Sequence, residues 1–369
     1  MKAIGIVLAG GKNEKLGELT KNRALAAMPV GGCYRCLDFA LSSLSSSGVG
    51  KIAVMTQYNS RSLHDHLSSS KWWDLGRKHG GLFIFSPYQT DSDSYWFRGT
   101  ADSIYQNISF LKRSNEQYVV ISSGDIVYKL DFNTILERHE KSGADITIVY
   151  KEDNGLDTSN YGVLTLDENE NVVDFEEKPL EPQTNLISTG IYVIQRTLLI
   201  KLLEIIIPEG RYDIVKDIFI RYRKRLKITG FKFEGYWRAI NTIDAYFSAN
   251  MDFLKKEVRD LFTKRFPYIE TKPKDEPPAK YNSGAVALDC LVGSGSIINS
   301  YILHSILFRK IYTGENSKII NSIIMERSLI GNNCYVENAI IDKEVVLSDG
   351  KEIIGAPGAP VIISKGSVI

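Results

Sequence analysis

Residues 3–11 read Ala-Ile-Gly-Ile-Val-Leu-Ala-Gly-Gly, an apolar and partly β-branched run that ends directly in two glycines. Such a run predicts a buried strand, and the two glycines predict a tight turn at its carboxyl end. The backbone N–H groups of a glycine turn can approach phosphate oxygens that a Cβ atom would keep away. This stretch therefore predicts a strand followed by a loop with room for a phosphate group.

Strand-like runs and helical patterns alternate through residues 1–266. Apolar runs of strand length recur at 3–9, 51–56, 82–86, 118–122, 145–150, 162–167, 172–178 and 188–194. Helical patterns occupy 103–112, 133–139, 197–206, 212–224 and 243–259. Alternation of this kind predicts an α/β domain, Rossmann-like, with a mostly parallel sheet covered on both faces.

A second domain is predicted beyond a connector. Residues 267–284, PYIETKPKDEPPAKYNSG, carry four prolines among charges and suit an extended linker. From residue 285 to 369, aliphatic residues recur at six-residue steps, as in Ile324, Ile330 and Val336. This period fits three short strands per turn, and so predicts a left-handed parallel β-helix of hexapeptide repeats. Solenoids of this kind end in open strand edges, and therefore commonly pack against partners.

Composition excludes several classes of protein. The formal net charge is +1, without the basic excess that a nucleic-acid surface requires, so no nucleic-acid partner is expected. No apolar run reaches the roughly 20 residues that span a bilayer, and no cleavable leader is recognisable, so neither membrane association nor secretion is expected. Four cysteines are too few for a disulfide framework. These observations predict a cytoplasmic protein.

The segment from Leu8 to Gly32, LAGGKNEKLGELTKNRALAAMPVGG, resembles the signature of the nucleotide-sugar pyrophosphorylases, most closely in its ADP-glucose pyrophosphorylase form. In that family Arg-Gly-Thr-Arg-Leu follows the two glycines, where this chain reads Lys-Asn-Glu-Lys-Leu. A later Arg-Ala-Lys-Pro-Ala block reads Arg-Ala-Leu-Ala-Ala here. The resemblance thus places Lys15 at the position of a phosphate-stabilising arginine, and Leu25 at the position of a lysine.

These replacements predict a weak phosphate site. Glu14 would face a triphosphate with like charge, and Lys15 cannot form the paired hydrogen bonds of a guanidinium group. Leu25 carries no charge. A functional ATP loop is therefore not expected.

Further segments extend the resemblance along the whole chain. Residues 95–107, YWFRGTADSIYQN, match the family's Gly-Thr-Ala-Asp segment near the nucleotide base. Residues 161–163 and 176–179 match its sugar-phosphate segments, and 188–192 resemble its glucose-contacting strand; the family uses the lysine of Glu-Lys-Pro on the phosphate of glucose 1-phosphate. The resemblance implies the following substrate-binding remnants: Gly10, Gly11, Gly99, Thr100, Ala101, Gly162, Glu177, Lys178 and Ser188.

The family also holds Mg²⁺ between two aspartates. Asp125, in a Gly-Asp pair, occupies the first position, and Ala239 stands in place of the second. A single carboxylate holds Mg²⁺ only loosely, because the ion keeps its waters unless enough oxygen ligands are supplied. Asp125 is therefore expected at most as a residual metal ligand, and no cofactor is expected in this chain.

The pattern of losses resembles the GlgD-type branch of the bacterial glucose-1-phosphate adenylyltransferases. Members of that branch accompany an active subunit, which uses Mg²⁺, in a hetero-oligomer (by the family's habit a heterotetramer) that makes ADP-glucose and pyrophosphate from ATP and glucose 1-phosphate. The resemblance implies a regulatory subunit in glycogen biosynthesis, with a sugar phosphate as ligand. Two alternatives remain open: a weakly active adenylyltransferase, and a stand-alone sensor of sugar phosphates or nucleotides.

Other reactive or aromatic residues are interpreted as structural. Cys33, Cys36, Cys290 and Cys334 are predicted to be structural, because no complete zinc set is evident. His64 and His66 are predicted at a surface helix end. The pairs Trp72-Trp73 and Trp96-Phe97, with Tyr95, are predicted to pack a loop or a subunit contact. The basic stretch 221–227 is predicted to be a solvated helix end, with an anionic effector site as the alternative.

Overall fold

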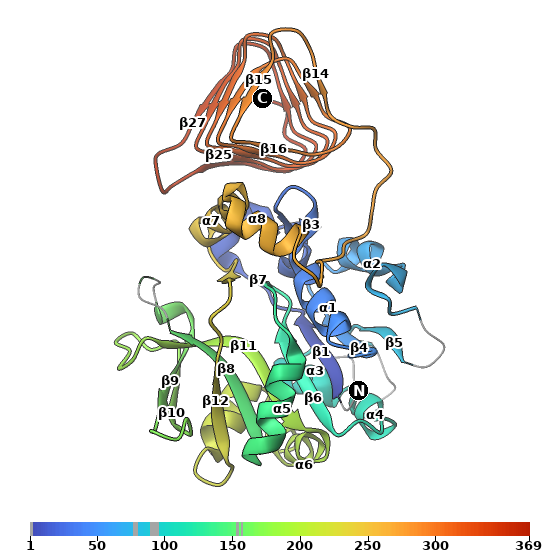
Figure 1. Cartoon of the computed structure of the whole chain (residues 1–369), viewed down its shortest axis with the longest axis vertical. Coiled ribbons are helices and arrows are strands. Elements are labelled where there is room, and N and C mark those ends of the chain that lie inside the picture. The colour runs from blue at the N-terminus through green and yellow to red at the C-terminus, as the bar shows by residue number, and fades with distance from the viewer. Residues whose placement is uncertain (1–2, 77–79, 89–95, 153–154, 156–157) are drawn as a thin grey trace.

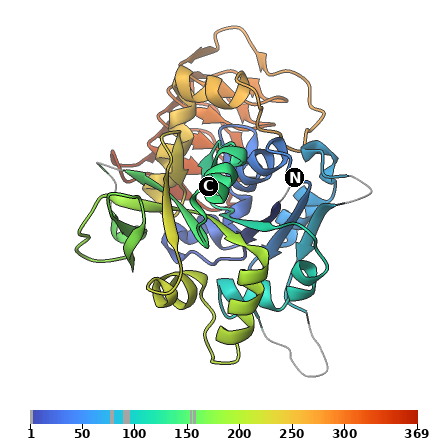
Figure 2. The same cartoon turned by 60° about the horizontal axis from the view of Figure 1, so that its bottom comes forward.

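The computed structural model describes residues 3–76, 80–88, 96–152, 155 and 158–369. It has two parts: a sheet covered by helices, and a triangular solenoid that is seen along its axis in Figure 1 and from a second direction in Figure 2. The predicted fold class, a Rossmann-like α/β domain followed by a left-handed parallel β-helix, is confirmed. Tyr95 lies outside the described residues.

The first domain is built on one sheet of nine strands. Its main path runs β10-β9-β11-β6-β1-β4-β5, while β8 pairs with β11 and β12 pairs with β8. The strands are β1 (Ala3–Ala9), β4 (Lys51–Thr56), β5 (Gly81–Phe85), β6 (Tyr118–Ser123), β8 (Ile146–Glu152), β9 (Gly162–Leu166), β10 (Val172–Glu177), β11 (Leu186–Gln195) and β12 (Ile228–Lys232). Two small ribbons accompany it, β2 (Pro29–Val30) with β3 (Tyr34–Arg35), and β7 (Ile126–Tyr128) with β13 (Trp237–Ala239).

The sheet is mixed, because two strands, β11 in its middle and β10 at its edge, run against the others. Strands β1, β4, β5 and β6 are parallel, whereas β11 is antiparallel to both β6 and β8. The carboxyl ends of β1 and β6 therefore meet at one edge, as ligand sites in parallel sheets require.

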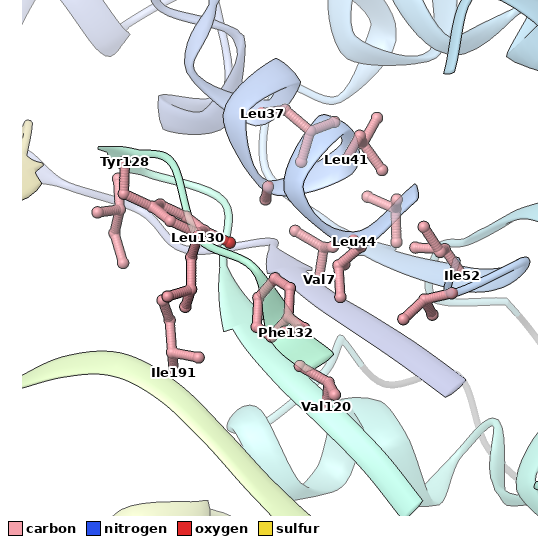
Figure 3. Packing of buried hydrophobic residues seen from close by; sticks show 14 of the residues in the cluster. Val7, Leu37, Leu41, Leu44, Ile52, Val120, Tyr128, Leu130, Phe132 and Ile191 are labelled. Carbon is pink, nitrogen blue, oxygen red and sulfur yellow. The ribbon is translucent and has the colours of Figure 1, made fainter. Parts of the chain in front are cut away.

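Helices cover both faces of the sheet. They are α1 (Cys36–Ser46), α2 (Arg61–Leu67), α3 (Thr100–Tyr105), α4 (Ile108–Lys112), α5 (Phe132–Ser142), α6 (Arg196–Ile206), α7 (Ile243–Met251) and α8 (Lys256–Thr263). One apolar cluster joins the sheet to α1 and α5 (Figure 3), and a second joins the opposite face to α3, α4 and α6. In the first cluster Leu37, Leu41 and Leu44 of α1 point toward Val7 and Ile52 of the sheet.

Several predicted helices are shorter or interrupted in the structure. The pattern at 103–112 forms α3 and α4, which are separated by Gln106 and Asn107. The pattern at 243–259 forms α7, a 3-10 turn (η6, Asp252–Leu254) and α8, because the backbone of Lys255 is extended (φ −68°, ψ 127°) and separates the turn from α8. The pattern at 212–224 contains a π-helical segment, η5 (Val215–Ile220). Further 3-10 turns are η1 (Glu14–Thr20), η2 (Leu25–Ala27), η3 (Ser70–Trp73) and η4 (Thr158–Asn160).

The second part is a solenoid with three parallel sheets. The first sheet contains β14 (Lys280–Tyr281), β17 (Ile297–Ile298), β20 (Tyr312–Thr313), β23 (Leu329–Ile330) and β26 (Val346–Leu347). The second contains β15 (Val286–Leu288), β18 (Tyr301–Leu303), β21 (Lys318–Ile320), β24 (Tyr335–Glu337) and β27 (Glu352–Ile354). The third contains β16 (Leu291–Val292), β19 (Ile306–Leu307), β22 (Ile323–Ile324), β25 (Ala339–Ile341) and β28 (Val361–Ile363). Ile324, Ile330 and Val336 are fully buried inside the prism, where the six-residue period predicted them.

The third sheet of the solenoid packs on the first domain. Its outward residues Ile306, Ile323 and Ile340 are fully buried and share one apolar cluster with Met28 and Phe253 of the first domain. In Figure 1, α7 and α8 lie directly beneath this face of the triangle. The two domains therefore share a core.

The chain between the domains is fixed by hydrogen bonds to the first domain. The indole Nε1 of Trp73 donates to the Glu270 carbonyl at 3.1 Å, and the Glu270 N–H donates to Ser42 Oγ at 2.9 Å. The Lys272 ammonium donates to the Asp65 carbonyl at 2.8 Å. Among the described residues, no helix is both long and apolar enough to cross a membrane.

Candidate functional site

Two adjoining cavities open where the carboxyl ends of the central strands meet. The larger, of about 550 Å³, is lined by Gly11, Lys15, Leu25, Asp125, Gly162, Glu177, Lys178, Ser188 and Ala239 among the residues that the sequence singled out. The smaller, of about 270 Å³, is lined by Gly10, Gly11, Gly99 and Thr100. Ala101 is fully buried in α3 and lines neither cavity. The structure thus brings the remaining predicted residues into one cleft.

The glycine loop after β1 crosses the larger cavity. A Cβ atom at Gly10 would lie 3.1 Å from Cβ of Gln57, whereas one at Gly11 would meet no atom within 4 Å. Asn13 caps the following 3-10 turn by accepting from the Lys15 N–H at 2.9 Å. Its amide group also donates to the Asn241 carbonyl at 2.7 Å, and the Lys15 ammonium donates to Oδ1 of Asn160. The loop is thereby connected to the opposite wall of the cleft.

The charges of this loop are partly neutralised by one another. The Lys12 ammonium lies 2.7 Å from a carboxylate oxygen of Glu14, and both side chains are exposed. This hydrogen bond and the lysine charge lower the pKa of Glu14, which keeps the carboxylate ionised. A triphosphate bound in this loop would therefore lie close to the negative charge of Glu14 as well as to the Lys12 ammonium group.

Leu25 closes the floor of the same cavity. It begins the 3-10 turn η2, is 8% exposed, and packs in the apolar cluster that contains Leu16 and Val127. Its packing explains a leucine here, but an aliphatic side chain offers no donor to a phosphate group.

Asp125 follows β6 at the base of the cavity. Its carboxylate accepts a hydrogen bond from Ser123, and burial raises its pKa, which the Ser123 bond and the nearby Lys178 ammonium oppose. The ribbon of β7 and β13 pairs Ile126 with Ala239, so Ala239 lies beside Asp125. The Ile240 N–H donates to the Asp125 carbonyl at 3.1 Å, which fixes this arrangement.

This neighbourhood does not fit Mg²⁺ well. Mg²⁺ requires near-octahedral oxygen ligation, and the Ala239 methyl group adds no oxygen next to the Asp125 carboxylate. Within the described residues, no group of three His, Cys, Asp or Glu side chains could hold a metal ion. The donor set is thus one carboxylate short of the pair that the family resemblance implies.

The opposite wall carries a lysine in a defined position. Lys178 follows β10 with a φ of 54°, and its N–H donates to the Tyr161 carbonyl at 3.0 Å. Its ammonium lies 3.7 Å from Glu177, and burial raises the pKa of Glu177. A Cβ atom at Gly162 would lie 2.7 Å from the Phe175 ring, so only glycine fits beside this lysine. The wall therefore offers one cation next to a carboxyl group.

Ser188 lies deeper in the same wall, at the β-bulge of β11. Its hydroxyl is 3.3 Å from the Tyr192 hydroxyl, and both residues are buried. Thr189 donates to the Val149 carbonyl at 2.8 Å. These bonds hold the small polar side chains in place.

The smaller cavity is bordered by two residues that sequence reasoning missed, Gln57 and Tyr58, and by Phe97 and Arg98 of the segment that resembles the family. Gln57 accepts from the Phe97 N–H at 2.6 Å, and Tyr58 stacks on Trp96 with ring centroids 5.4 Å apart. The Arg98 guanidinium donates two hydrogen bonds to the buried Asp102 carboxylate and lies 4.0 Å from the ring centroid of Tyr212. Gln57 and Tyr58 directly follow β4. Because residues that follow parallel strands meet at one edge of the sheet, this position could have indicated that they border the cleft.

A third cavity, of about 410 Å³, lies between the domains and was not predicted. It is lined by seven basic residues, Arg23, Arg35, Lys272, Lys274, Arg327, Lys343 and Lys365, and three acidic ones, Asp65, Glu326 and Glu344. Burial alone would raise the pKa of Glu326, but the Lys343 and Lys274 ammonium groups outweigh it and lower that pKa to about 2. Glu326 thus neutralises part of this basic surface.

One structural interpretation from the sequence is wrong, because His66 is not at the surface. It is 6% exposed and its Nε2 lies 2.6 Å from the Asp38 carboxylate beneath α1. Its ring also meets the buried Trp73 edge-on, at 5.4 Å between centroids. The apolar side of α2 faces inward at this position, which the His-Asp-His spacing could not indicate.

The other secondary candidates have ordinary surroundings. Cys36 and Cys334 are buried, Cys290 is half-buried and Cys33 is exposed, and all four are free thiols. In the basic stretch 221–227, Arg221 pairs with Glu209 and Arg223 pairs with Asp174. These pairings neutralise the stretch only in part, because Lys224, Arg225 and Lys227 add three further positive charges.

Comparison with known proteins agrees with this geometry. Residues 4–256 match the model of the Nucleotidyl transferase family, and residues 277–357 match that of the GlmU-like C-terminal hexapeptide. The chain belongs to the nucleotidyl transferase family. The match covers the sheet domain with both cavities of the cleft.

Relatives within this family extend over most of the chain. It is 35% identical to the glucose-1-phosphate adenylyltransferase of Geobacillus stearothermophilus over 320 residues, which are 86% of this chain and 82% of the relative. It is 36% identical to that of Bacillus mycoides (strain KBAB4) over 319 residues, 86% and 85% of the two chains. It is 35% identical to that of Bacillus subtilis (strain 168) over 320 residues, 86% and 84%.

Proposed function

We propose that this chain is a catalytically deficient glucose-1-phosphate adenylyltransferase that regulates an active homologous subunit in glycogen biosynthesis. The observation that carries the proposal is Ala239 beside Asp125, where the reaction needs a second carboxylate for Mg²⁺. Its similarity to glucose-1-phosphate adenylyltransferases supports the reaction class. The deficiency supports a role beside an active subunit, in a cytoplasmic hetero-oligomer such as a heterotetramer, with Mg²⁺ in the active partner.

The reaction requires alignment and charge neutralisation more than covalent chemistry. A phosphate oxygen of glucose 1-phosphate attacks the α-phosphorus of ATP, and pyrophosphate leaves. Lys15, Leu25 and Ala239 each remove or weaken one charge-stabilising group in the cleft. If each loss costs roughly 2–4 kcal/mol in the transition state, the rate falls by very roughly 10⁴ to 10⁹. These losses are not strictly additive, because groups that act as a unit are coupled.

The cleft keeps more of its sugar-phosphate side than of its triphosphate side. Lys178 offers a partly exposed ammonium group, and Gly162, Glu177 and Ser188 line the cavity beside it. On the triphosphate side, Lys12 is paired with Glu14. Glucose 1-phosphate should therefore bind more tightly than ATP, which calorimetry with each ligand measures. Equal or tighter ATP binding would contradict this assignment.

The first experiment is ADP-glucose synthesis by this chain alone, and then by a mixture with the active homologue from the same cell. No product from the isolated chain, with a changed maximal rate or effector response in the mixture, is the expected result. Robust turnover by the isolated chain would instead favour an active enzyme, and an unchanged rate in the mixture would exclude regulation.

A gain-of-function variant tests the deficiency directly. The triple variant Lys15→Arg, Leu25→Lys and Ala239→Asp should restore measurable turnover, whereas the double variant that keeps Ala239 should not. A sensor without an enzyme partner is the second candidate, since the sugar-phosphate wall is retained. A pull-down from the source cell separates the two, because only a regulatory subunit brings down a homologous chain.

A further inference from the structure

The turn that follows the glycine loop is bonded across the larger cavity. The side-chain amide of Asn13 donates to the Asn241 carbonyl at 2.7 Å, and the Lys15 ammonium donates to Oδ1 of Asn160. Asn241 comes two residues after β13, and Asn160 is the last residue of η4. All four residues line the same cavity. The two contacts therefore span this cavity from the glycine loop to two separate parts of its opposite wall.

The same turn is also fixed on its own side of the cleft. The Thr20 hydroxyl, at the end of η1, donates to the Asn13 carbonyl at 2.9 Å. The side-chain amide of Asn59 donates to the carbonyls of Thr20 and Lys21 at 3.1 and 3.0 Å. A turn that is bonded on both sides opens only when some of these bonds break.

The contact between Asn13 and Asn241 closes the path that the phosphates of a nucleotide would take. Asn241 follows Ala239, which lies beside Asp125. A triphosphate held by the N–H groups of the glycine loop would lie between this loop and Asp125, and the contact joins these same two sides of the cavity. The sugar-phosphate side is different, because Lys178 is held by its own bond to the Tyr161 carbonyl.

The side chain at position 13 determines whether this contact exists. Where this chain has Asn13, the family motif that it resembles has glycine, which has no side-chain donor. The backbone of Asn13 is extended (φ −128°, ψ 110°), a conformation that any residue can adopt. The backbone therefore does not require an asparagine here, and the contact is a property of the side chain alone.

We propose that Asn13 is an autoinhibitory latch, which holds the glycine loop against the far side of the cleft and excludes nucleoside triphosphates while a sugar monophosphate can still bind. The loop must be released before a triphosphate reaches its N–H groups, so the apparent affinity is reduced to the fraction of molecules in which the loop is open. This inference rests on the proposed function for the assignment of the two sides of the cleft. It adds a steric barrier to the loss of charge.

The test uses Asn13→Ser in the full chain. Serine also caps a turn, but its hydroxyl is too short to reach the Asn241 carbonyl. Calorimetry should show that ATP binds about threefold to tenfold more tightly than to the wild type, which is the effect of one hydrogen bond on an equilibrium. The dissociation constant of glucose 1-phosphate should not change. An unchanged or still undetectable affinity for ATP, or an equal gain for both ligands, would overturn the proposal.

Thr20→Val is the matched control. It removes a hydrogen bond to the Asn13 carbonyl from the near side of the same turn, and leaves the contact across the cavity in place. This variant should bind ATP as the wild type does. A gain equal to that of Asn13→Ser would mean that any loosening of the turn admits ATP, and would contradict the latch. Circular dichroism checks that both variants are folded.

Limited proteolysis measures the release of the loop without a ligand. Trypsin cleaves after lysine, and cleavage after Lys12 and Lys15 requires the turn to open locally. This cleavage should be faster in Asn13→Ser than in the wild type and in Thr20→Val. Equal rates in the three proteins would overturn the proposal.

The latch and the proposed function fail in separate experiments. Binding of ATP is measured without glucose 1-phosphate, so that no ADP-glucose forms. Robust turnover by the isolated wild-type chain would contradict the proposed function. Equal ATP affinities of the wild type and Asn13→Ser would overturn the latch alone.

Discussion

At the scale of single residues, the cleft depends on contacts that link distant parts of the chain. The Asn13 amide donates to the carbonyl of Asn241, which is 228 positions away in the sequence. The Lys15 ammonium donates to the side chain of Asn160, which is 145 positions away. The sequence indicated Lys15, Leu25 and Ala239 because each interrupts a recognisable local motif. It did not indicate Asn160 or Asn241 as their neighbours, because such pairs depend on how strands and loops are brought together.

A glycine in the turn between β2 and β3 allows the first prediction. Gly31 has a φ of 60°, and a Cβ atom there would lie 2.7 Å from the ring of Phe253. Gly31→Ala should therefore lower the free energy of unfolding by about 2–4 kcal/mol, through backbone strain and a clash in the core. Urea unfolding measures this change.

Gly17 provides the matched control for this substitution. Its φ is 50°, but a Cβ atom would meet nothing within 4 Å. Gly17→Ala should therefore lower the free energy of unfolding through backbone strain alone, by about 1 kcal/mol. Similar losses for the two variants would show that the contact with Phe253 is unimportant.

At the scale of elements, periodicity predicted most strands and helices but not their interruptions. The strands of the sheet alternate with helices in the expected order, and the solenoid follows its six-residue period. The breaks lie at Asn107 (φ −110°, ψ 23°) and Lys255 (φ −68°, ψ 127°), single backbone departures from the helix that a pattern of apolar residues does not record. His66 was misplaced for the same reason, since its partner Asp38 belongs to another helix.

Helix α5 contains a histidine that predicts a pH dependence of stability. His139 is 1% exposed, its Nδ1 lies 2.7 Å from the Thr147 hydroxyl, and burial lowers its pKa to about 4. In the unfolded chain the pKa of this imidazole is about 6.5. Between pH 6.5 and 4 the imidazole is therefore protonated in the unfolded state but stays neutral in the folded state. The contribution of His139 to the free energy of unfolding should therefore be constant above pH 6.5, and should fall as the pH decreases from 6.5 to 4.

The size and the test of this effect follow from linkage. Between pH 7 and 4, protonation of His139 in the unfolded state should lower the free energy of unfolding by about 3 kcal/mol at most. His139→Gln should lose less stability over this range than the wild type, as measured by urea unfolding at pH 7, 6 and 5. Parallel curves for the two proteins would contradict the assignment to His139.

At the scale of the whole molecule, one buried ion pair joins the two domains. Arg23 of the first domain donates to Asp342 of the solenoid at 2.5 Å, and the side chains are 6% and 1% exposed. Because removing one partner leaves a buried charge without compensation, Arg23→Met should destabilise the protein by about 3–5 kcal/mol. Thermal unfolding of this variant should show a lower midpoint.

The double variant Arg23→Met, Asp342→Leu is the control for this pair. It removes both charges and should recover most of the lost stability, since buried ion pairs can be replaced by apolar residues at little cost. A double variant as unstable as Arg23→Met would mean that packing, and not the isolated charge, determines the loss.

The apolar cluster shared by the domains also has a consequence during synthesis. Met28 and Phe253 are made well before their contacts Ile306, Ile323 and Ile340 in the solenoid. At about 5–20 residues per second, the ribosome needs roughly ten seconds to complete the last third of the chain. During this time the first domain exposes an apolar surface, which stays open to contacts with other molecules until the carboxyl-terminal part of the chain covers it.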